Sequence, residues 1–343
     1  MIHHLLGIEL PLIQAPMAGV QGSALAIAVS QAGALGSLPC ALLSREQMRS
    51  ELGAIGAATQ RPFNVNFFCH VPPAPDAARE AKWRAALQPY YTELGITDAS
   101  TAPPRLPFDA SAAELLDVFR PAVVSFHFGL PSVDLLQRAR ACGARIISSA
   151  TTVAEALWLE SRAVDAIIAQ GLEAGGHRGH FLSDDLSRQS GTFALLPQIV
   201  RAVRVPVIAA GGIVDRAGVT AALALGAAGV QVGTAYLLCN ETTTSTVHRA
   251  ALTSEDSAHT ALTNLFTGRA ARGIVNRLMR ELGSWSHLPP EFPLAAGPLA
   301  PLRAHAEAAG RGDFSPLWAG QNVTGCKKVP AGQLTRDLMQ RAE

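Results

Sequence analysis

The feature that most constrains the fold is a repeated alternation of short apolar segments with longer amphipathic ones. Strands that alternate with helices predict a parallel sheet covered by helices. Eight strand–helix units are typical of a closed barrel, so we predict an α/β protein with a (β/α)8 TIM barrel. The eight expected strands are Leu12–Ala15, Ala34–Leu38, Phe63–Phe68, Ala122–Phe128, Arg145–Ser149, Asp165–Ala169, Pro206–Ala210 and Gly229–Gly233.

Amphipathic stretches with helical spacing lie between most of these strands. Two of them begin with the capping-box pattern, Ser44 with Gln47 and Thr152 with Glu155, in which side chains satisfy the first backbone N–H groups. We therefore expect a layer of helices around the sheet, at residues 23–31, 44–58, 132–141, 152–162, 193–203 and 216–225.

Two regions interrupt the repeat. The proline-rich stretch His70–Pro121 is too long for one connection, and we expect helices at Ala77–Leu94 and Ala112–Phe119 within it. The chain also continues well beyond the eighth strand, with helical and loop-like patterns from residue 242 to residue 319. We interpret this second region as a mainly helical C-terminal cap subdomain over the barrel mouth.

The expected domain organisation has three parts. Residues 1–241 form the barrel, residues 242–319 form the cap, and residues 320–343 close the barrel through an amphipathic segment at Gln333–Arg341. Its apolar face would contain Leu334 and Leu338.

Composition excludes several classes of protein. The formal net charge is +1 over 343 residues, so there is no basic surface of the kind that binds nucleic acid. The five cysteines form no Cys-x-x-Cys pair, which favours reduced thiols in a cytoplasmic protein. The uncharged segment Ala217–Asn240 is long enough to cross a bilayer. However, it divides into an alanine-rich helix and a valine-rich strand, so we expect no membrane insertion.

The loop Gln170–His180 has the composition of an active-site loop. Four glycines lie within nine residues of it, directly after an apolar strand, and glycine lets a backbone approach a ligand closely. His177 stands among them, and an imidazole exchanges a proton near neutral pH. His177 and His180 have no acidic or cysteine partner at ligand spacing, so we expect no metal.

Two further glycine-rich turns, Ala209–Ile213 and Gln231–Ala235, follow the last two strands. Barrels often bind phosphate at these positions, on backbone N–H groups at helix N-termini, although tight packing alone also favours small residues there. The first strand ends in Gln14–Gly19, a rigid edge suited to a flat ring. Asn66 and Gln170 end two other strands and offer both donors and acceptors. Together these groups suit flavin mononucleotide (FMN).

Several segments together resemble the nitronate monooxygenase family, formerly called 2-nitropropane dioxygenases. They occur in the family's order and extend from the first strand almost to the C-terminus. The segments are Ala15–Gly19, Asn64–Phe68, Ser125–Gly129, Glu173–Gly179, Ala210–Ile213, Gln231–Thr234, Phe266–Gly273 and Leu317–Gln321.

The resemblance implies an FMN-dependent oxidoreductase of small molecules. Such an enzyme oxidises alkyl nitronates, for example propionate 3-nitronate, with O2 to a carbonyl compound and nitrite through a flavin semiquinone. It also implies a detoxifying role, with His177 as the catalytic residue. The flavin ring would lie on Pro16, Met17 and Ala18, and its polar edge on Asn66 and Gln170. Further FMN contacts would come from Gly175, Gly176, Gly211, Gly212, Gln231, Val232, Gly233 and Thr234.

The role of His177 depends on the ionic form of the substrate. A neutral nitroalkane must lose a proton from carbon, which an imidazole can accept. A nitronate has already lost it, and a protonated imidazole would then bind the anion. His127 either contacts the substrate or makes a structural hydrogen bond. Arg269 and Arg272 either reach the substrate anion or form structural ion pairs.

Two other functions remain open from the sequence. One is an NAD(P)H-dependent FMN reductase on the same barrel, of the enoyl-acyl-carrier-protein reductase or quinone reductase type. The other is a barrel that binds FMN without catalysis. Neither a nucleophile elbow nor a pair of catalytic carboxylates is present in the sequence, so hydrolase chemistry has no support.

Overall fold

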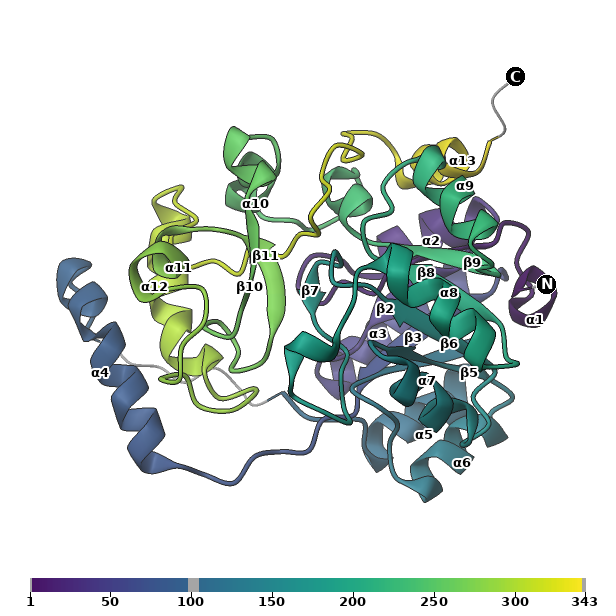
Figure 1. Ribbon diagram of the computed structural model, residues 1–343, viewed down its shortest axis with the longest axis horizontal. Helices are drawn as coiled ribbons and strands as arrows, with labels where there is room; N and C mark the ends of the chain where they lie inside the picture. The colour runs from purple at the N-terminus through teal and green to yellow at the C-terminus, as the bar shows by residue number, and fades with distance from the viewer. Residues whose placement is uncertain (1, 98–104, 341–343) are drawn as a thin grey trace.

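The computed structural model describes residues 2–97 and 105–340. Eight parallel strands form one sheet in the order β1-β9-β8-β6-β5-β4-β3-β2. A parallel bridge between Ile13 and Leu35 links the first and last strands of this order, which nearly closes the sheet into a barrel (Figure 1). All eight predicted strands are confirmed. They are β1 (Leu12–Gln14), β2 (Gly36–Pro39), β3 (Phe63–Phe68), β4 (Val123–His127), β5 (Arg145–Ala150), β6 (Ala166–Gln170), β8 (Val207–Ala210) and β9 (Gly229–Val232).

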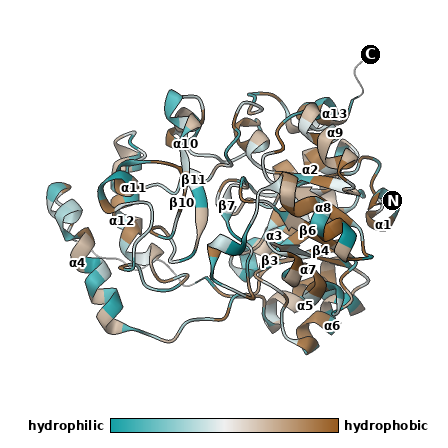
Figure 2. Cartoon of the chain, in the orientation of Figure 1, coloured by the Kyte–Doolittle hydropathy of each residue, from teal (hydrophilic) through white to brown (hydrophobic). Residues whose placement is uncertain are grey.

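Helices cover the outside of the barrel, and the expected ones are all present. Figure 2 shows many hydrophobic residues on these helices, for example on α8 (Thr192–Ala202), whereas α4 (Ala77–Glu93) and α10 (Thr246–Leu252) carry more hydrophilic ones. The short 3-10 helices are η1 (Leu186–Arg188), η2 (Thr234–Leu238) and η3 (Glu255–Ala258). The helices around the barrel are α2 (Ser23–Gln31), α3 (Arg45–Ala58), α5 (Ala110–Phe119), α6 (Val133–Ala141), α7 (Val153–Glu160), α8 (Thr192–Ala202) and α9 (Arg216–Ala224).

The two predicted capping boxes have different outcomes. Ser44 and Gln47 form the reciprocal pair at the start of α3. At the start of α7, Thr152 accepts from the Glu155 N–H, but the Glu155 carboxylate does not return to Thr152. It is buried and accepts instead from the backbone N–H groups of Thr151 at 2.7 Å and Phe181 at 2.6 Å. This carboxylate therefore ties the loop after β6 to the barrel.

The barrel has an inner and an outer apolar layer. The inner layer consists of strand residues such as Ile147 and Ile208, and Ile2 and Leu6 belong to it. Both come from α1 (Ile2–Leu6), a helix that the sequence analysis did not predict. The outer layer packs the opposite faces of the strands against the helices. Successive strand residues thus serve two layers, which explains why the strands are apolar on both faces.

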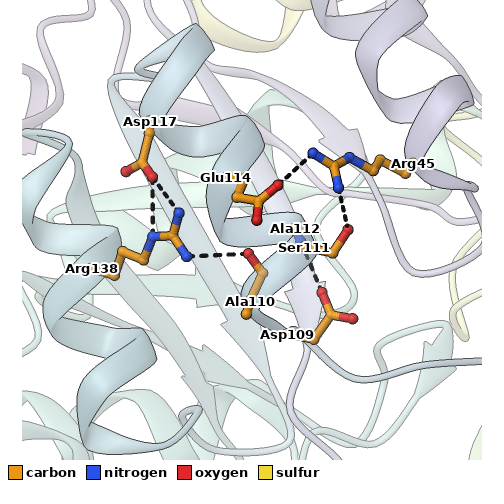
Figure 3. Close-up of polar contacts among 8 residues, drawn as sticks. All are labelled: Arg45, Asp109, Ala110, Ser111, Ala112, Glu114, Asp117 and Arg138. Carbon is orange, nitrogen blue, oxygen red and sulfur yellow. Dashed lines mark hydrogen bonds and ion pairs between the residues drawn. The ribbon is translucent and has the colours of Figure 1, made fainter.

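Ion pairs connect α5 to the helices on both sides of it (Figure 3). Arg45 of α3 bonds Glu114, and Arg138 of α6 bonds Asp117 at 2.6 Å. All four side chains are at least about one-third exposed, and surface pairs of this kind contribute little to stability. The apolar layer beneath them therefore holds α5 in place.

A second lobe lies beside the barrel (Figure 1). Its strands β10 and β11 form an antiparallel sheet with β7, a two-residue strand from the loop after β6. Trp83 of α4 donates from its indole N–H to the Ala295 oxygen at 3.1 Å, so the insertion before β4 contributes to this lobe. The elements of the second lobe are α4 (Ala77–Glu93), α10 (Thr246–Leu252), β10 (Thr260–Thr263), β11 (Ala271–Ile274), α11 (Arg277–Leu282) and α12 (Ala296–Ala308), with β7 (Gly176–His177) at its border.

The last helix, α13 (Ala331–Met339), packs against α2 and α9 on the outside of the barrel. Leu334 and Leu338 are buried, as the amphipathic pattern predicts, and Tyr236 bonds Thr335 at 2.8 Å. The expected end of this helix at residue 341 lies outside the described residues. Among the residues described, no helix is both long enough and apolar enough to cross a membrane.

Candidate functional site

A cavity opens at the carboxyl ends of the barrel strands, between the barrel and the second lobe. Residues from both lobes line it, including Trp318 and His248. Val232 is fully buried within the outer core layer and does not line the cavity. All the other predicted site residues do: Pro16, Met17, Ala18, Asn66, His127, Gln170, Gly175, Gly176, His177, Gly211, Gly212, Gln231, Gly233 and Thr234.

The backbone of His177 is held from both lobes. Its strand, β7, pairs with β11, where His177 lies opposite Ala271. Its backbone oxygen accepts from Gln170 Nε2 at 3.0 Å and from His127 Nε2 at 3.2 Å. Gln170 also accepts from the Gly179 N–H at 2.8 Å. The loop is therefore a fixed platform for the histidine.

Both ring nitrogens of His127 have partners inside the protein. Nδ1 lies 2.6 Å from Ser149 Oγ, and Nε2 bonds the His177 carbonyl. Since a carbonyl only accepts, Nε2 carries the hydrogen and Nδ1 accepts from Ser149. Burial lowers the pKa of His127 to about 3, so the ring is neutral. This geometry favours the structural alternative for His127, although its ring lines the cavity.

The path of the loop above His127 requires a glycine. A Cβ at position 179 would lie 2.7 Å from both His127 Cε1 and Ser149 Oγ. Any larger residue would push the loop away from the barrel, and His177 with it.

Aromatic rings surround the imidazole of His177. Burial holds the pKa of His177 well below its usual range, and the positive charge of Arg105 lowers it further. The ring is therefore neutral at neutral pH, and its side chain is half-buried among aromatic rings. The four neighbouring rings have centroids at 6.0, 5.9, 5.2 and 5.6 Å and belong to Phe68, Phe128, Phe292 and Trp318.

Thr267 determines which ring nitrogen of His177 is available. His177 Nε2 lies 2.9 Å from Thr267 Oγ1, and this hydroxyl donates its hydrogen to the Arg269 oxygen at 3.4 Å. The hydroxyl must then accept from His177, which places the imidazole hydrogen on Nε2. Nδ1 then carries no hydrogen and keeps its lone pair.

The far side of the cavity suits a phosphate and a flavin ring. Gly211 and Gly212, at the end of β8, have φ values of 114° and 74°, a turn that favours glycine. Thr234 accepts from the Gly320 N–H at 3.0 Å, which leaves its own hydrogen to donate. Gln231 Oε1 is buried with no partner among the described residues. This acceptor fits a ligand with a ring N–H, such as a flavin.

The two amides expected at the flavin edge are already engaged in part. Asn66 donates from Nδ2 to Ser125 Oγ at 2.9 Å. Gln170 uses its oxygen and one N–H for the loop around His177. Each retains bonding capacity toward the cavity, but both also hold the barrel edge together.

Neither arginine considered from the sequence as a substrate contact lines the cavity. Arg269 bonds the His180 oxygen and stacks on Phe128, with its guanidinium carbon 4.2 Å from the ring centroid. Arg272 donates to the Leu172 oxygen at 2.8 Å. Both are therefore structural, although their partners are carbonyls and a ring rather than carboxylates. Among the described residues, no cluster of three metal-ligating side chains occurs.

The sequence analysis missed the cavity residues that come from the insertion and the second lobe. They include Arg105, Phe292, Trp318 and His248, which line the cavity or surround His177. Burial lowers the pKa of His248 to about 4. These residues lie in segments without a strand–helix rhythm, and no local pattern predicts that they meet at the barrel mouth.

Comparison with known proteins identifies the family. A family model described as nitronate monooxygenase matches residues 1–341. A nitronate monooxygenase from Paraburkholderia phytofirmans is 42% identical over 99% of this chain and 95% of its own length. A solved structure of nitroalkane oxidase from Streptomyces ansochromogenes has a TM-score of 0.89 at 37% identity, covering 98% of this chain and 96% of that one. FabK from Thermotoga maritima is more distant, with a TM-score of 0.73 at 26% identity, covering 98% and 94%.

The family match spans both lobes of the chain. The chain is an enzyme, and it belongs to the nitronate monooxygenase family of flavin-dependent oxidoreductases.

Proposed function

We propose that the cavity binds FMN and a small alkyl nitronate. The product of the reaction with O2 would be a carbonyl compound and nitrite. The observation that carries this proposal is the neutral, half-buried His177, which lies among aromatic rings and lines the same cavity as the glycine turns after β8 and β9. A substrate at His177 would thus lie beside a ring bound on the opposite side of the same cavity.

The protein's own groups have separate roles in this proposal. Pro16, Met17 and Ala18 would support the flavin ring, and Gln231 would accept from it. Gly212 and Thr234 would bind the phosphate. The bound flavin supplies the electron-accepting chemistry, and the protein supplies binding, orientation and electrostatics.

His177 would act as the base for neutral nitroalkanes. Its Nδ1 lone pair takes the proton from the carbon that carries the nitro group. The lowered pKa keeps the lone pair free at neutral pH. A substrate bound among the aromatic rings around His177 would displace water, which would strengthen the electrostatic contacts with the reacting groups.

The domain roles follow from the same geometry. We propose residues 1–241 as the FMN-binding barrel, residues 242–319 as the substrate-capping subdomain and residues 320–343 as the closing segment, of which 341–343 lie outside the described residues. The five cysteines are free, which supports a reducing compartment such as the cytoplasm.

Anaerobic stopped flow tests the proposal. The FMN-loaded protein is mixed separately with ethyl nitronate and with NADH, and the absorbance of the flavin is followed. We expect rapid reduction by the nitronate and no response to NADH. Rapid bleaching by NADH without a response to the nitronate would instead establish the reductase alternative. Bound FMN with no response to either would favour the non-catalytic barrel.

A further inference from the structure

Arg105 is a cation at the junction of two cavities. It lines the cavity that contains His177, and it also lines a second, larger cavity between α3, α5 and the second lobe. Leu42 and Phe68 are the other residues shared by both. The guanidinium carbon lies 5.9 Å from the ring centroid of Phe292, which is also a neighbour of His177.

This guanidinium has no carboxylate beside it in the His177 cavity, although Glu80 and Asp109 line the second cavity. None of the residues that line the His177 cavity is an aspartate or glutamate, and Arg105 is the one lysine or arginine among them. No ion pair or side-chain hydrogen bond of Arg105 is found among the described residues either. Burial lowers its pKa to about 10, so it remains charged at neutral pH. A partly buried cation is costly unless an anion accompanies it.

An FMN phosphate held at the glycine turns would lie too far from Arg105 to be that anion. Arg105 is anchored at the end of β3, where its backbone oxygen accepts from His70 Nε2 at 3.1 Å. The glycine turns follow β8 and β9. Around the nearly closed barrel, β8 lies four places from β3 and β9 lies three, so the turn after β8 stands directly across the barrel mouth and the turn after β9 nearly so.

His177 does not provide a positive charge that could bind an anionic substrate. Its imidazole is neutral, so it offers no charge to an anionic substrate. Arg269, the other arginine near these aromatic rings, is occupied by the His180 oxygen and the Phe128 ring. An anion among the aromatic rings around His177 therefore has Arg105 as its nearest available cation among the residues that line the cavity.

We propose that Arg105 binds the anionic nitro group of the nitronate. The inference rests on the proposed function and assigns separate roles to Arg105 and His177. Arg105 binds substrates that arrive as anions, whereas His177 takes the proton from substrates that arrive neutral. A guanidinium suits this role because its planar N–H groups match two oxygens of a planar anion.

Steady-state kinetics with anionic ethyl nitronate and neutral nitroethane test these separate roles. Arg105→Met should raise the KM for ethyl nitronate roughly 10- to 100-fold, the loss typical of a charged hydrogen bond. The KM for neutral nitroethane should stay near the wild-type value. Arg105→Lys should recover part of the loss, because it restores the charge without the planar fork. Arg84→Met is the matched control, since Arg84 is exposed and lines only the second cavity.

A binding measurement separates this inference from the proposed function. Propanoate carries two oxygens on a planar anionic group, like ethyl nitronate, and its Kd can be followed by tryptophan fluorescence because Trp318 lines the cavity. We expect Arg105→Met to weaken propanoate binding in the same proportion as it raises the nitronate KM.

An equal change in KM for both substrates, or an unchanged KM for ethyl nitronate, would overturn the role of Arg105. If the wild-type protein oxidises neither substrate, the proposed function fails. The propanoate Kd alone then tests whether Arg105 binds an anion. In that case, equal Kd values for the wild type and Arg105→Met would overturn the inference.

Discussion

His127 Nε2 lies 3.2 Å from the backbone oxygen of His177, so one histidine positions the peptide that carries the other. Ser149, at 2.6 Å from Nδ1, orients the ring of His127. Gln170 adds a second donor to the same carbonyl at 3.0 Å. The candidate catalytic loop is thus held by side chains from β4, β5 and β6, and its geometry depends on the closed barrel.

Replacing His127 tests this positioning. In His127→Ala the His177 carbonyl loses one donor, and the loop can shift by a fraction of an ångström. A misplacement near 1 Å costs up to about 100-fold in rate. We expect kcat to fall by roughly 10-fold or more while the KM and the FMN content stay close to wild type. A kcat equal to that of the wild type would show that Gln170 alone suffices.

Replacing His177 removes the proposed base. His177→Asn should retain FMN, because the phosphate turns lie elsewhere, but should lose roughly 100-fold or more of kcat/KM on neutral nitroethane. Turnover of ethyl nitronate should fall less, since that substrate has no proton to lose. The exposed His259 provides the matched control, His259→Asn. Unchanged turnover of nitroethane by His177→Asn would contradict the assignment of the base.

Buried neutral histidines should make the protein sensitive to mild acid. Burial lowers the pKa of His127 to about 3 and that of His180 to about 4, whereas an unfolded histidine titrates near 6.5. At pH values between the folded and unfolded pKa of these histidines, the unfolded chain binds more protons than the folded one. The free energy of unfolding is therefore greatest above about pH 6.5 and decreases as pH falls. Urea unfolding at about pH 7 and about pH 5 measures this change. A midpoint that is constant over that range would contradict the burial of these rings in solution.

Replacing Gln231 should weaken FMN binding but leave the stability of the apoprotein unchanged. Its Oε1 is buried without a partner in the described residues, and an unsatisfied buried acceptor is costly. Gln231→Leu should therefore weaken FMN binding roughly 10-fold without lowering the stability of the apoprotein. FMN fluorescence titration and urea unfolding measure the two effects. Gln198→Leu, at an exposed position on α8, should leave the Kd for FMN unchanged.

Local patterns in the sequence predict the barrel well because strands and helices have different hydrophobic periods. Each expected strand is present, and α2 spans Ser23–Gln31 as predicted. The error at Glu155 shows the limit of such patterns. The spacing from Thr152 is correct for a capping box, but the carboxylate bonds Phe181 instead. A local pattern identifies the residues that are able to form a bond, and the fold decides which partner each one meets.

Some features of the candidate site are likewise predictable from local sequence, whereas others depend on the fold. Strand ends are local features, so the sequence identified Asn66, Gln170 and the glycine turns as residues of one rim, and the structure places them around one cavity. Their roles toward FMN remain predictions. The sequence could not show that His127 is occupied on both nitrogens, because its partners come from other strands.

The sequence by itself determined the barrel, the family and the loop that carries His177, since each depends on periodicity or on residues adjacent in the chain. Only the tertiary structure decided what surrounds that histidine. Arg105, Phe292 and Trp318 come from the insertion and the C-terminal region, far apart in the chain. They meet because the buried side chains of α4 pack with those of α12. This packing is a long-range apolar contact, and no local pattern specifies which distant surface a helix will cover.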